Sequence, residues 1–248
     1  MSKQSGLGDR FLIDGHNLSG DINSPALAGG PAALVVTGVD KGAPERIGGV
    51  RDGSLGWTAF FNPGEEADAA HAVLSALPQA DVHCMYLHTV TLGRPAACLV
   101  AKQIGYDGNR GDDGAFTFAV QAQANGYGLE WGVQLTPGMR TDTAATDGDS
   151  VDLTAAGAFG LQAYLQVLAV TGTSVTVKLQ QSSDNGVADA WADVTGGAFA
   201  AATEPGVQRL QTARGQAVER YLRAVTTGTF TEAVFAVVVA RNEVETEF

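Results

Sequence analysis

The sequence predicts an all-β fold with one short helix, divided into two consecutive domains. Short stretches in which apolar and polar residues alternate recur along the chain, and glycine-bearing turns separate them at regular intervals. Residues 137–150 are rich in Thr, Asp, Ala and Gly, and Met139 is their only large apolar residue, which is typical of a linker. We therefore expect a β domain in residues 1–136, a linker at 137–150 and a small β-sandwich in residues 151–248.

The first domain combines strands with the single helix. In the segment 54–61, alternate residues share one face of a strand: Leu55, Trp57, Ala59 and Phe61. The helix is expected over 65–77, with acidic residues in its first turn, an apolar stripe and Pro78 as its stop. A hairpin is expected at 106–114, because Gly108 and Gly114 can supply positive φ. The strands predicted here are 10–13, 33–37, 54–61, 82–90, 96–104 and 115–124.

The second domain shows turn signals about every ten residues, a rhythm typical of a β-sandwich. Residues 183–186, Ser-Asp-Asn-Gly, are its clearest hairpin tip. The strands predicted here are 163–171, 174–181, 190–194, 207–210, 220–226 and 234–240.

A long charged loop is expected at 38–53 in the first domain. Connections longer than about 12 to 15 residues are uncommon in compact domains unless they have a function, so this one is a candidate contact between subunits. The alternative is a merely mobile loop. Its candidate contact residues are Asp40, Lys41, Glu45, Arg46, Arg51 and Asp52.

Charge and composition exclude some partners. Charged residues make up only 17% of the chain, and a surface poor in charge often meets other protein. The net charge of −12 argues against binding free nucleic acid, although not against a conduit through which DNA slides. No apolar stretch is long enough for a membrane span or a secretory leader, and Cys84 and Cys98 are expected as buried thiols. We expect folding in a reducing cytoplasm.

The sequence offers no set of residues for catalysis, so we expect no enzyme activity, cofactor or metal. The four histidines, at 16, 71, 83 and 88, show no nucleophile–base or zinc-ligand spacing. Residues 107–113 resemble a calcium loop superficially, but a hairpin turn explains them better. Trp57, Trp131 and Trp191 could stack on sugars, but such tryptophans are more often core or interface anchors.

The order of features in residues 2–136 resembles phage tail tube proteins. The chain has a Ser19-Gly20-Asp21-Ile22 start, the long charged loop, and then the tract 48–62, Gly-Gly-Val-Arg-Asp-Gly-Ser-Leu-Gly-Trp-Thr-Ala-Phe-Phe-Asn. A helix and closing strands follow. The tract 114–126, Gly-Ala-Phe-Thr-Phe-Ala-Val-Gln-Ala-Gln-Ala-Asn-Gly, is especially similar to major tail proteins of long-tailed, siphovirus-like actinobacterial phages.

The resemblance implies a two-sheet barrel or sandwich with a flanking helix, and six copies of it in a ring. Inner strands would form a lumen wall, and rings would stack through the long loop and the termini into a tube for DNA ejection. The expected partners are further copies and other tail proteins, namely tape measure, tail terminator and distal tail. Residues 151–248 would be an appended immunoglobulin-like domain on the exterior. The virion would be assembled in the host cytoplasm.

Two other functions remain open from the sequence. A carbohydrate- or receptor-binding virion protein fits the β-sandwich and its aromatic residues. A head-decoration protein has the same composition and differs only in its location.

Overall fold

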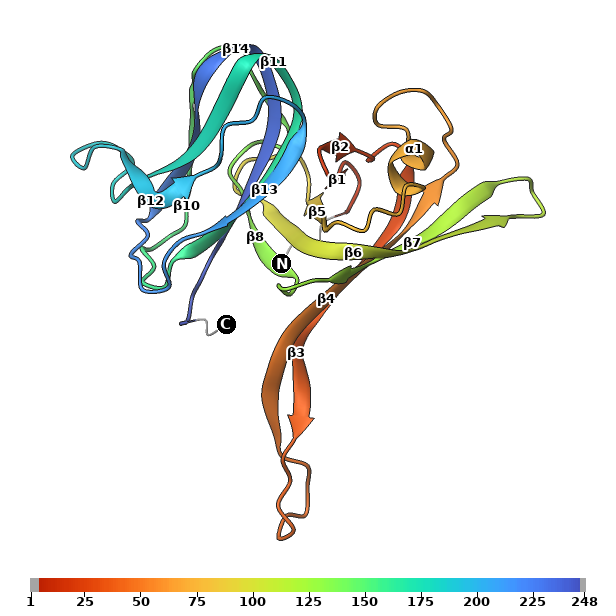
Figure 1. The fold of residues 1–248 in the computed structure, drawn as a ribbon. Coiled ribbons are helices and arrows are strands. Elements are labelled where there is room, and N and C mark those ends of the chain that lie inside the picture. The colour runs from red at the N-terminus through yellow and green to blue at the C-terminus, as the bar shows by residue number, and fades with distance from the viewer. Residues whose placement is uncertain (1–4, 246–248) are drawn as a thin grey trace. The chain divides into compact units, whose positions relative to one another are not determined.

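The computed structural model describes residues 5–245. Within them the chain forms fourteen strands and one short helix, α1, with about 58% of residues in strands and 2% in the helix. Strand pairing is antiparallel and links the fourteen strands into one sheet that does not close into a barrel. The prediction of an all-β fold with one short helix is confirmed (Figure 1).

The chain divides into two compact units that interleave along the sequence. We call residues 5–19, 85–98 and 131–245 the sandwich unit, and residues 20–84 and 99–130 the arm unit. The chain thus passes between the units several times, instead of dividing once between 136 and 151. Strand pairing between residues far apart in sequence produces this interleaving, and no local composition signals it.

The predicted linker 137–150 is wrong in its local structure, because the segment contains strands. It holds β9 (Arg140–Asp142) and the start of β10 (Asp147–Asp152), and both pair with β14 (Tyr221–Arg241). The polar residues there are satisfied within the fold. Arg140 forms an ion pair of 2.8 Å with the buried Asp142, which also accepts a hydrogen bond from the Thr226 hydroxyl at 2.6 Å.

The sandwich unit begins with a tight hairpin, whose first strand lies at 10–13 as the sequence predicts. Strand β1 (Arg10–Ile13) pairs with β2 (His16–Asn17) through a two-residue turn at Asp14 and Gly15. Both turn residues have positive φ, 48° and 81°, which is the backbone geometry that favours Asp-Gly. The turn is held by a hydrogen bond of 2.7 Å from the Gly15 amide to the buried Gln166 side chain.

Two long, bent strands build the rest of this unit (Figure 1). Strand β11 (Leu161–Ser182) pairs with β14 along almost its whole length, and the register shifts around Gly172. The predicted strands 163–171 and 174–181 are therefore one element. One core cluster contains apolar side chains from both halves of each long strand: Leu165, Val177, Leu222 and Val237 are examples.

Shorter strands widen the two halves. Strand β12 (Ala192–Ala198) pairs with the second half of β11, and β13 (Gly206–Gln211) pairs with its first half. Besides β9 and β10, β14 also pairs with β8 (Glu130–Gln134).

The arm unit is a twisted sheet with the order β3, β4, β7, β6. One face of β4 is buried at Leu55, Trp57 and Ala59, as predicted, whereas Phe61 lies beyond the strand and is half-exposed. The four strands are β3 (Ile22–Val35), β4 (Arg46–Phe60), β7 (Phe116–Ala124) and β6 (Pro95–Arg110). Strand β6 belongs to this unit from Leu99 onward, and β5 (Val82–Leu87) belongs to it in residues 82–84.

Two predictions for the arm unit are corrected. Helix α1 spans only Ala70–Leu74 instead of 65–77, because no side chain caps its start and Leu77 has a left-handed φ of 44°. The second half of the predicted loop 38–53 is strand, because β4 begins at Arg46, and only residues 38–45 lie in the loop that connects β3 to β4. Glycines and charged residues at 46–53 give this segment the composition of a loop. They are compatible with a strand here because the ribbon has no buried face that would require alternating apolar residues.

The bends of the long strands require glycine, and this generates a prediction. Gly228 has a φ of 124°, and a Cβ there would lie 2.3 Å from the Ser174 carbonyl oxygen. Gly228→Ala should lower the free energy of unfolding by about 1–3 kcal/mol, measured by urea denaturation. Gly215→Ala is the control, because a Cβ there meets no atom within 4 Å. Equal stabilities of the two variants would contradict this account of the bend.

Candidate assembly surface

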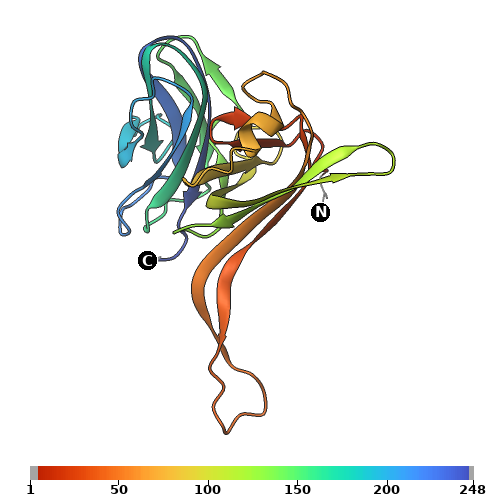
Figure 2. The ribbon, with the colours of Figure 1, turned by 45° about the vertical axis from the view of Figure 1, so that its right-hand side comes forward.

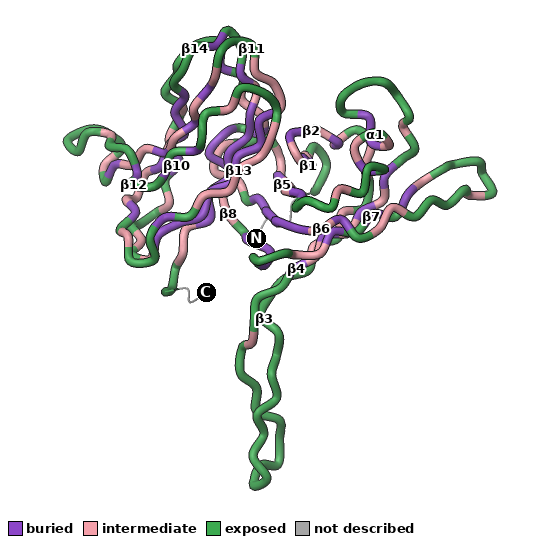
Figure 3. The backbone as a smooth tube through the Cα atoms, in the orientation of Figure 1, coloured by how far each residue is buried: buried purple, intermediate pink, exposed green. Residues whose placement is uncertain are grey.

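The most exposed part of the arm unit is the long hairpin of β3 and β4. We call residues 28–52 the arm. Every residue of the arm is exposed except Gly49, which is half-buried, and Figure 3 shows this segment green to its tip. Figure 2 shows the same ribbon extending away from the sheet from which it grows. Beyond its root, where Leu129 and Gln123 contact it, no other part of the described chain buries a residue of the arm.

The arm carries large apolar side chains in this exposed position. Leu34 faces Ile47 across the two strands, and Leu34 lies over Gly49, where a Cβ would be 3.0 Å from its side chain. Six of the seventeen exposed large hydrophobic residues in the described chain lie here: Leu34, Val35, Val36, Val39, Ile47 and Val50. Val39 and Val50 are the most exposed of them, at 110% and 82%.

These side chains lie on both faces of the ribbon. Side chains alternate along a strand, so Ile47 and Val50 point to opposite faces. Two strands alone are marginally stable at best in water, because neither face is buried. Strand β3 also pairs only with β4, so its other edge is open to a further strand. The arm therefore has the properties of a contact surface.

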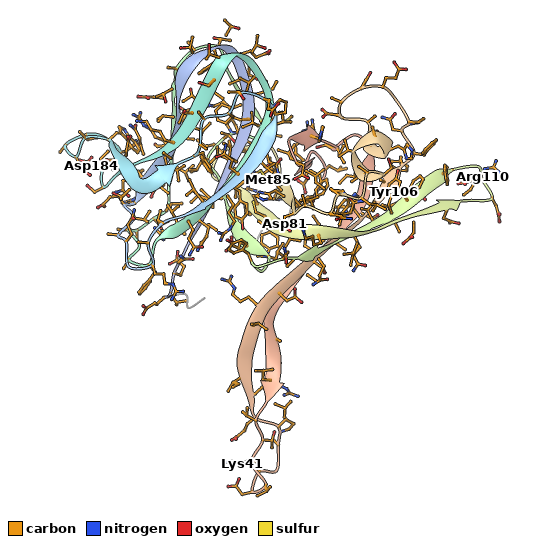
Figure 4. All side chains as sticks on the ribbon, in the orientation of Figure 1. Lys41, Asp81, Met85, Tyr106, Arg110 and Asp184 are labelled. Atoms are coloured by element: carbon orange, nitrogen blue, oxygen red, sulfur yellow. The ribbon has the colours of Figure 1, made fainter. Side chains whose placement is uncertain are left out.

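All six charged residues predicted as contacts lie on the arm. The structure brings three of them together at the tip, where the Lys41 ammonium lies 3.9 Å from Asp40 and 3.6 Å from Glu45 (Figure 4). Arg46, Arg51 and Asp52 lie apart along β4. With three acidic and three basic residues the arm has no net charge, while the whole chain carries −12. Their part in subunit contacts stays a prediction.

Sequence reasoning missed the apolar residues of the arm. The run Leu34-Val35-Val36 lies in the predicted strand 33–37, but a run of this kind is typical of a buried strand. The available signal was the combination of this run with Val39, Ile47 and Val50 in one charged, glycine-rich hairpin.

The root of the arm is locked by two glycines that face each other. Gly29 pairs with Gly53, and a Cβ on either would lie 2.6 Å from an atom of Leu129. The Gln123 amide adds hydrogen bonds of 2.8 Å to the Asp52 carboxylate and 3.0 Å to the Gly53 carbonyl oxygen. The ribbon thus leaves the sheet at a fixed, tightly packed point.

A second hairpin, formed by β6 and β7, has a different surface. Its turn at 111–115 is polar, and Arg110 marks its tip in Figure 4. At its base, Tyr106 stacks on Phe118 at 4.0 Å and its hydroxyl lies 2.9 Å from His71 Nδ1. Burial raises the pKa of the Tyr106 hydroxyl. Phe61 and Phe116, both 39% exposed, extend this aromatic cluster to the surface.

Residues considered for catalysis or metal binding lie in several places. The described residues contain no group of three or more His, Cys, Asp or Glu that could hold a metal ion. His88 approaches the Asp9 carboxylate at 3.1 Å, and Asp9 also accepts hydrogen bonds from the Thr89 amide and the Tyr86 hydroxyl. Burial and then this hydrogen bond raise the pKa of Tyr86.

The remaining predicted positions are accounted for as follows. Cys84 and Cys98 are buried, as predicted. Trp57 is buried and Trp191 packs under the Arg223 guanidinium at 4.5 Å, whereas Trp131 is 59% exposed. Residues 107–110 lie on β6, and 111–115 form the turn of the predicted hairpin. None of the described helices is both long and apolar enough to traverse a bilayer.

Comparisons with known proteins give low similarities. No protein-family model matches the chain, and no curated protein matches it. A chain in the virion of a native gene transfer agent particle is similar over 52% of this chain and 98% of its own, with 13% identity and a TM-score of 0.40. Chains in the activated baseplate of phage p2 are similar over 95% of this chain and 99% of their own, with 10% identity and a TM-score of 0.32 in the form with Sr, and 11% and 0.31 in the form with Ca. These neighbours are virion and baseplate components, and the similarity is too low to assign a family.

The locked root of the arm can be tested by mutation. Gly53→Ala should lower the free energy of unfolding by about 1–3 kcal/mol, because the new methyl group would collide with the Leu129 backbone. Gly42→Ala at the tip, where a Cβ meets nothing within 4 Å, should change it by less than about 0.5 kcal/mol. Chemical denaturation measures both variants, and a harmless Gly53→Ala would show that the root is not tightly packed.

Proposed function

We propose that this chain is a structural protein of a phage virion, without catalytic activity, and that it is the subunit of the tail tube. Subunits associate through the arm, which lies against the next copy. The observation that carries the proposal is the arm itself, a 25-residue ribbon whose apolar side chains nothing within the subunit covers. Exposed apolar patches of this kind mark protein interfaces.

The sequence resemblance supports the tail tube as the particular structure. The resemblance to tail tube proteins rests on the order of a start segment, a long charged segment, the tract 48–62, a helix and closing strands. The arm occupies the place of the long charged segment, α1 follows, and β7 contains most of the closing tract. Six copies in a ring, with rings stacked into a conduit for DNA, are the arrangement this resemblance implies.

Electrostatics supports association of identical copies. Each copy carries −12, so two copies repel at long range, but the arm has no net charge and can approach another copy without adding to that repulsion. The same acidic character would keep duplex DNA from adhering to a conduit wall. The other tail proteins are expected to meet this subunit at the ends of the tube.

A precise shortening of the arm tests the proposal. Ala33 pairs with Gly48, so replacing residues 34–47 by Asn-Gly would close the ribbon with a two-residue turn. The unmodified protein, when concentrated, should form rings or hollow tubes about 100 Å wide, as expected for six compact subunits around a duplex-sized pore. The shortened protein should remain monomeric in sedimentation velocity and in negative-stain electron microscopy.

The second hairpin provides the matched control. Replacing residues 111–115 by Asn-Gly joins Arg110 to Phe116, which are paired in the ladder, and removes no large apolar residue. This variant should assemble like the unmodified protein, and both variants should unfold at similar denaturant concentrations. Normal tubes from the arm-shortened protein would refute the role of the arm. If antibodies against this protein label the head of the particles instead of the tail, the protein is a head-decoration protein and the tail tube proposal is refuted.

The apolar side chains of the arm allow a finer test. Val39→Asp combined with Val50→Asp should weaken assembly at least about tenfold. Burial of each valine side chain at the contact contributes about 1.5–3 kcal/mol, and a carboxylate in its place would have to be desolvated. Monomer stability should stay within about 0.5 kcal/mol, since both residues are exposed in the subunit. Val187→Asp, at an 86% exposed site in the sandwich unit, is the control. Concentration-dependent light scattering measures assembly; equal effects of the two changes would contradict a specific arm contact.

A further inference from the structure

A cleft of about 460 Å³ opens in the sandwich unit beside Trp131. Its volume lies in the range of small-molecule sites, which are mostly apolar with a few polar groups. Strand β8 contributes Trp131 and Val133, the end of β10 contributes Val151, and β14 contributes Val239. Its polar lining residues are Asp152, Thr154, Arg241 and Glu243.

Trp131 is the large aromatic residue that lines this cleft. It is 59% exposed, although it lies on a strand that pairs with β14 through Val133 and Val239. The neighbouring Gly132 lets the two strands approach closely, because a Cβ there would lie 2.3 Å from the Val239 carbonyl oxygen. The indole is therefore held on a rigid element with room beside it.

The polar groups at the rim are arranged as pairs. The Arg220 guanidinium donates to both oxygens of Asp152, at 2.7 and 2.6 Å, and the Thr154 amide donates to the same carboxylate at 2.7 Å. Arg220 lowers the pKa of Asp152 to about 2, so this carboxylate is ionised at neutral pH. Arg241, with a side chain only 10% exposed, pairs at 2.9 Å with Glu243, whose carboxylate is 76% exposed. Each rim carboxylate thus has its own guanidinium.

We propose that this cleft binds a short neutral carbohydrate, whose ring stacks on Trp131 and whose hydroxyl groups hydrogen-bond to the rim. A sugar ring has an apolar face of C–H groups and an equatorial set of hydroxyl groups, which fits an indole beside ionised acceptors. A purely apolar ligand would desolvate the charged rim and offer it no hydrogen bonds in return. An anionic ligand gains nothing from a rim in which each positive charge is already neutralised. This inference does not rest on the proposed tail tube.

Trp131 variants in the complete chain test the proposal. The protein is screened on an array of neutral mono- to tetrasaccharides, and hits are titrated by calorimetry and by tryptophan fluorescence. Trp131→Ala should weaken binding at least about tenfold, and Trp131→Phe should weaken it less, because the phenyl ring retains part of the stacking surface. Glu243→Gln, which keeps an acceptor oxygen, should weaken it only a few-fold.

The controls separate the possible outcomes. Phe60→Ala removes a 44% exposed aromatic residue in the arm unit and should leave binding unchanged. Circular dichroism and denaturation should show that Trp131→Ala is folded, since its ring is largely exposed. Absence of binding to every saccharide at millimolar concentration would overturn the proposal, and so would binding that Trp131→Ala leaves intact. Loss of self-assembly in Trp131→Ala, without saccharide binding, would assign the cleft to a second copy and also overturn it.

Discussion

A ribbon of two strands has no second layer, and the arm is such a ribbon at residues 28–35 and 46–52, joined by a loop at 36–45. Its backbone groups pair only within the hairpin, and its apolar side chains meet solvent on both faces. Contacts at the root of the arm hold this ribbon in place. The Gly29–Gly53 pair packs against Leu129, and Gln123 binds the backbone and carboxylate at the root. The arm is therefore packed against the rest of the arm unit at its root, whereas its apolar side chains are exposed toward its tip.

The sandwich unit solves a different physical problem. Strands of more than twenty residues would expose one face for a long distance, but β11 and β14 bend where glycine permits it, around Gly172 and Gly228. Their two halves then share one core, so the unit buries its own apolar face and needs no partner for stability. The cleft beside Trp131 is small by comparison, which suits a ligand better than a subunit.

Local patterns in the sequence predicted the local parts of this structure. The strand at 10–13, the buried face of β4 and most other strand positions follow from alternation and turn chemistry. The interleaved units, the strands in 137–150 and the continuity of β11 depend on pairing with distant residues, such as Thr141 with Val234, which no local pattern encodes. At the candidate assembly surface, charge predicted six residues that lie on the arm, and their role in contacts is still a prediction. An exposed apolar run has the same sequence pattern as a buried one, so the apolar surface could not be predicted.

The energy of the arm also constrains what it can build. Burying six side chains that are each worth about 1.5–3 kcal/mol gives about 9–18 kcal/mol, which is comparable with the estimated 4–15 kcal/mol cost of immobilising one subunit on another. A single arm contact is therefore weak. An arm on one surface that docks on a different surface of the next copy is a heterologous contact, which generates rings or filaments instead of closed pairs. In such an assembly every subunit makes two contacts, one through its own arm and one through the arm of a neighbour. The stability of the assembly increases with the number of these contacts, so self-association through the arm should be cooperative.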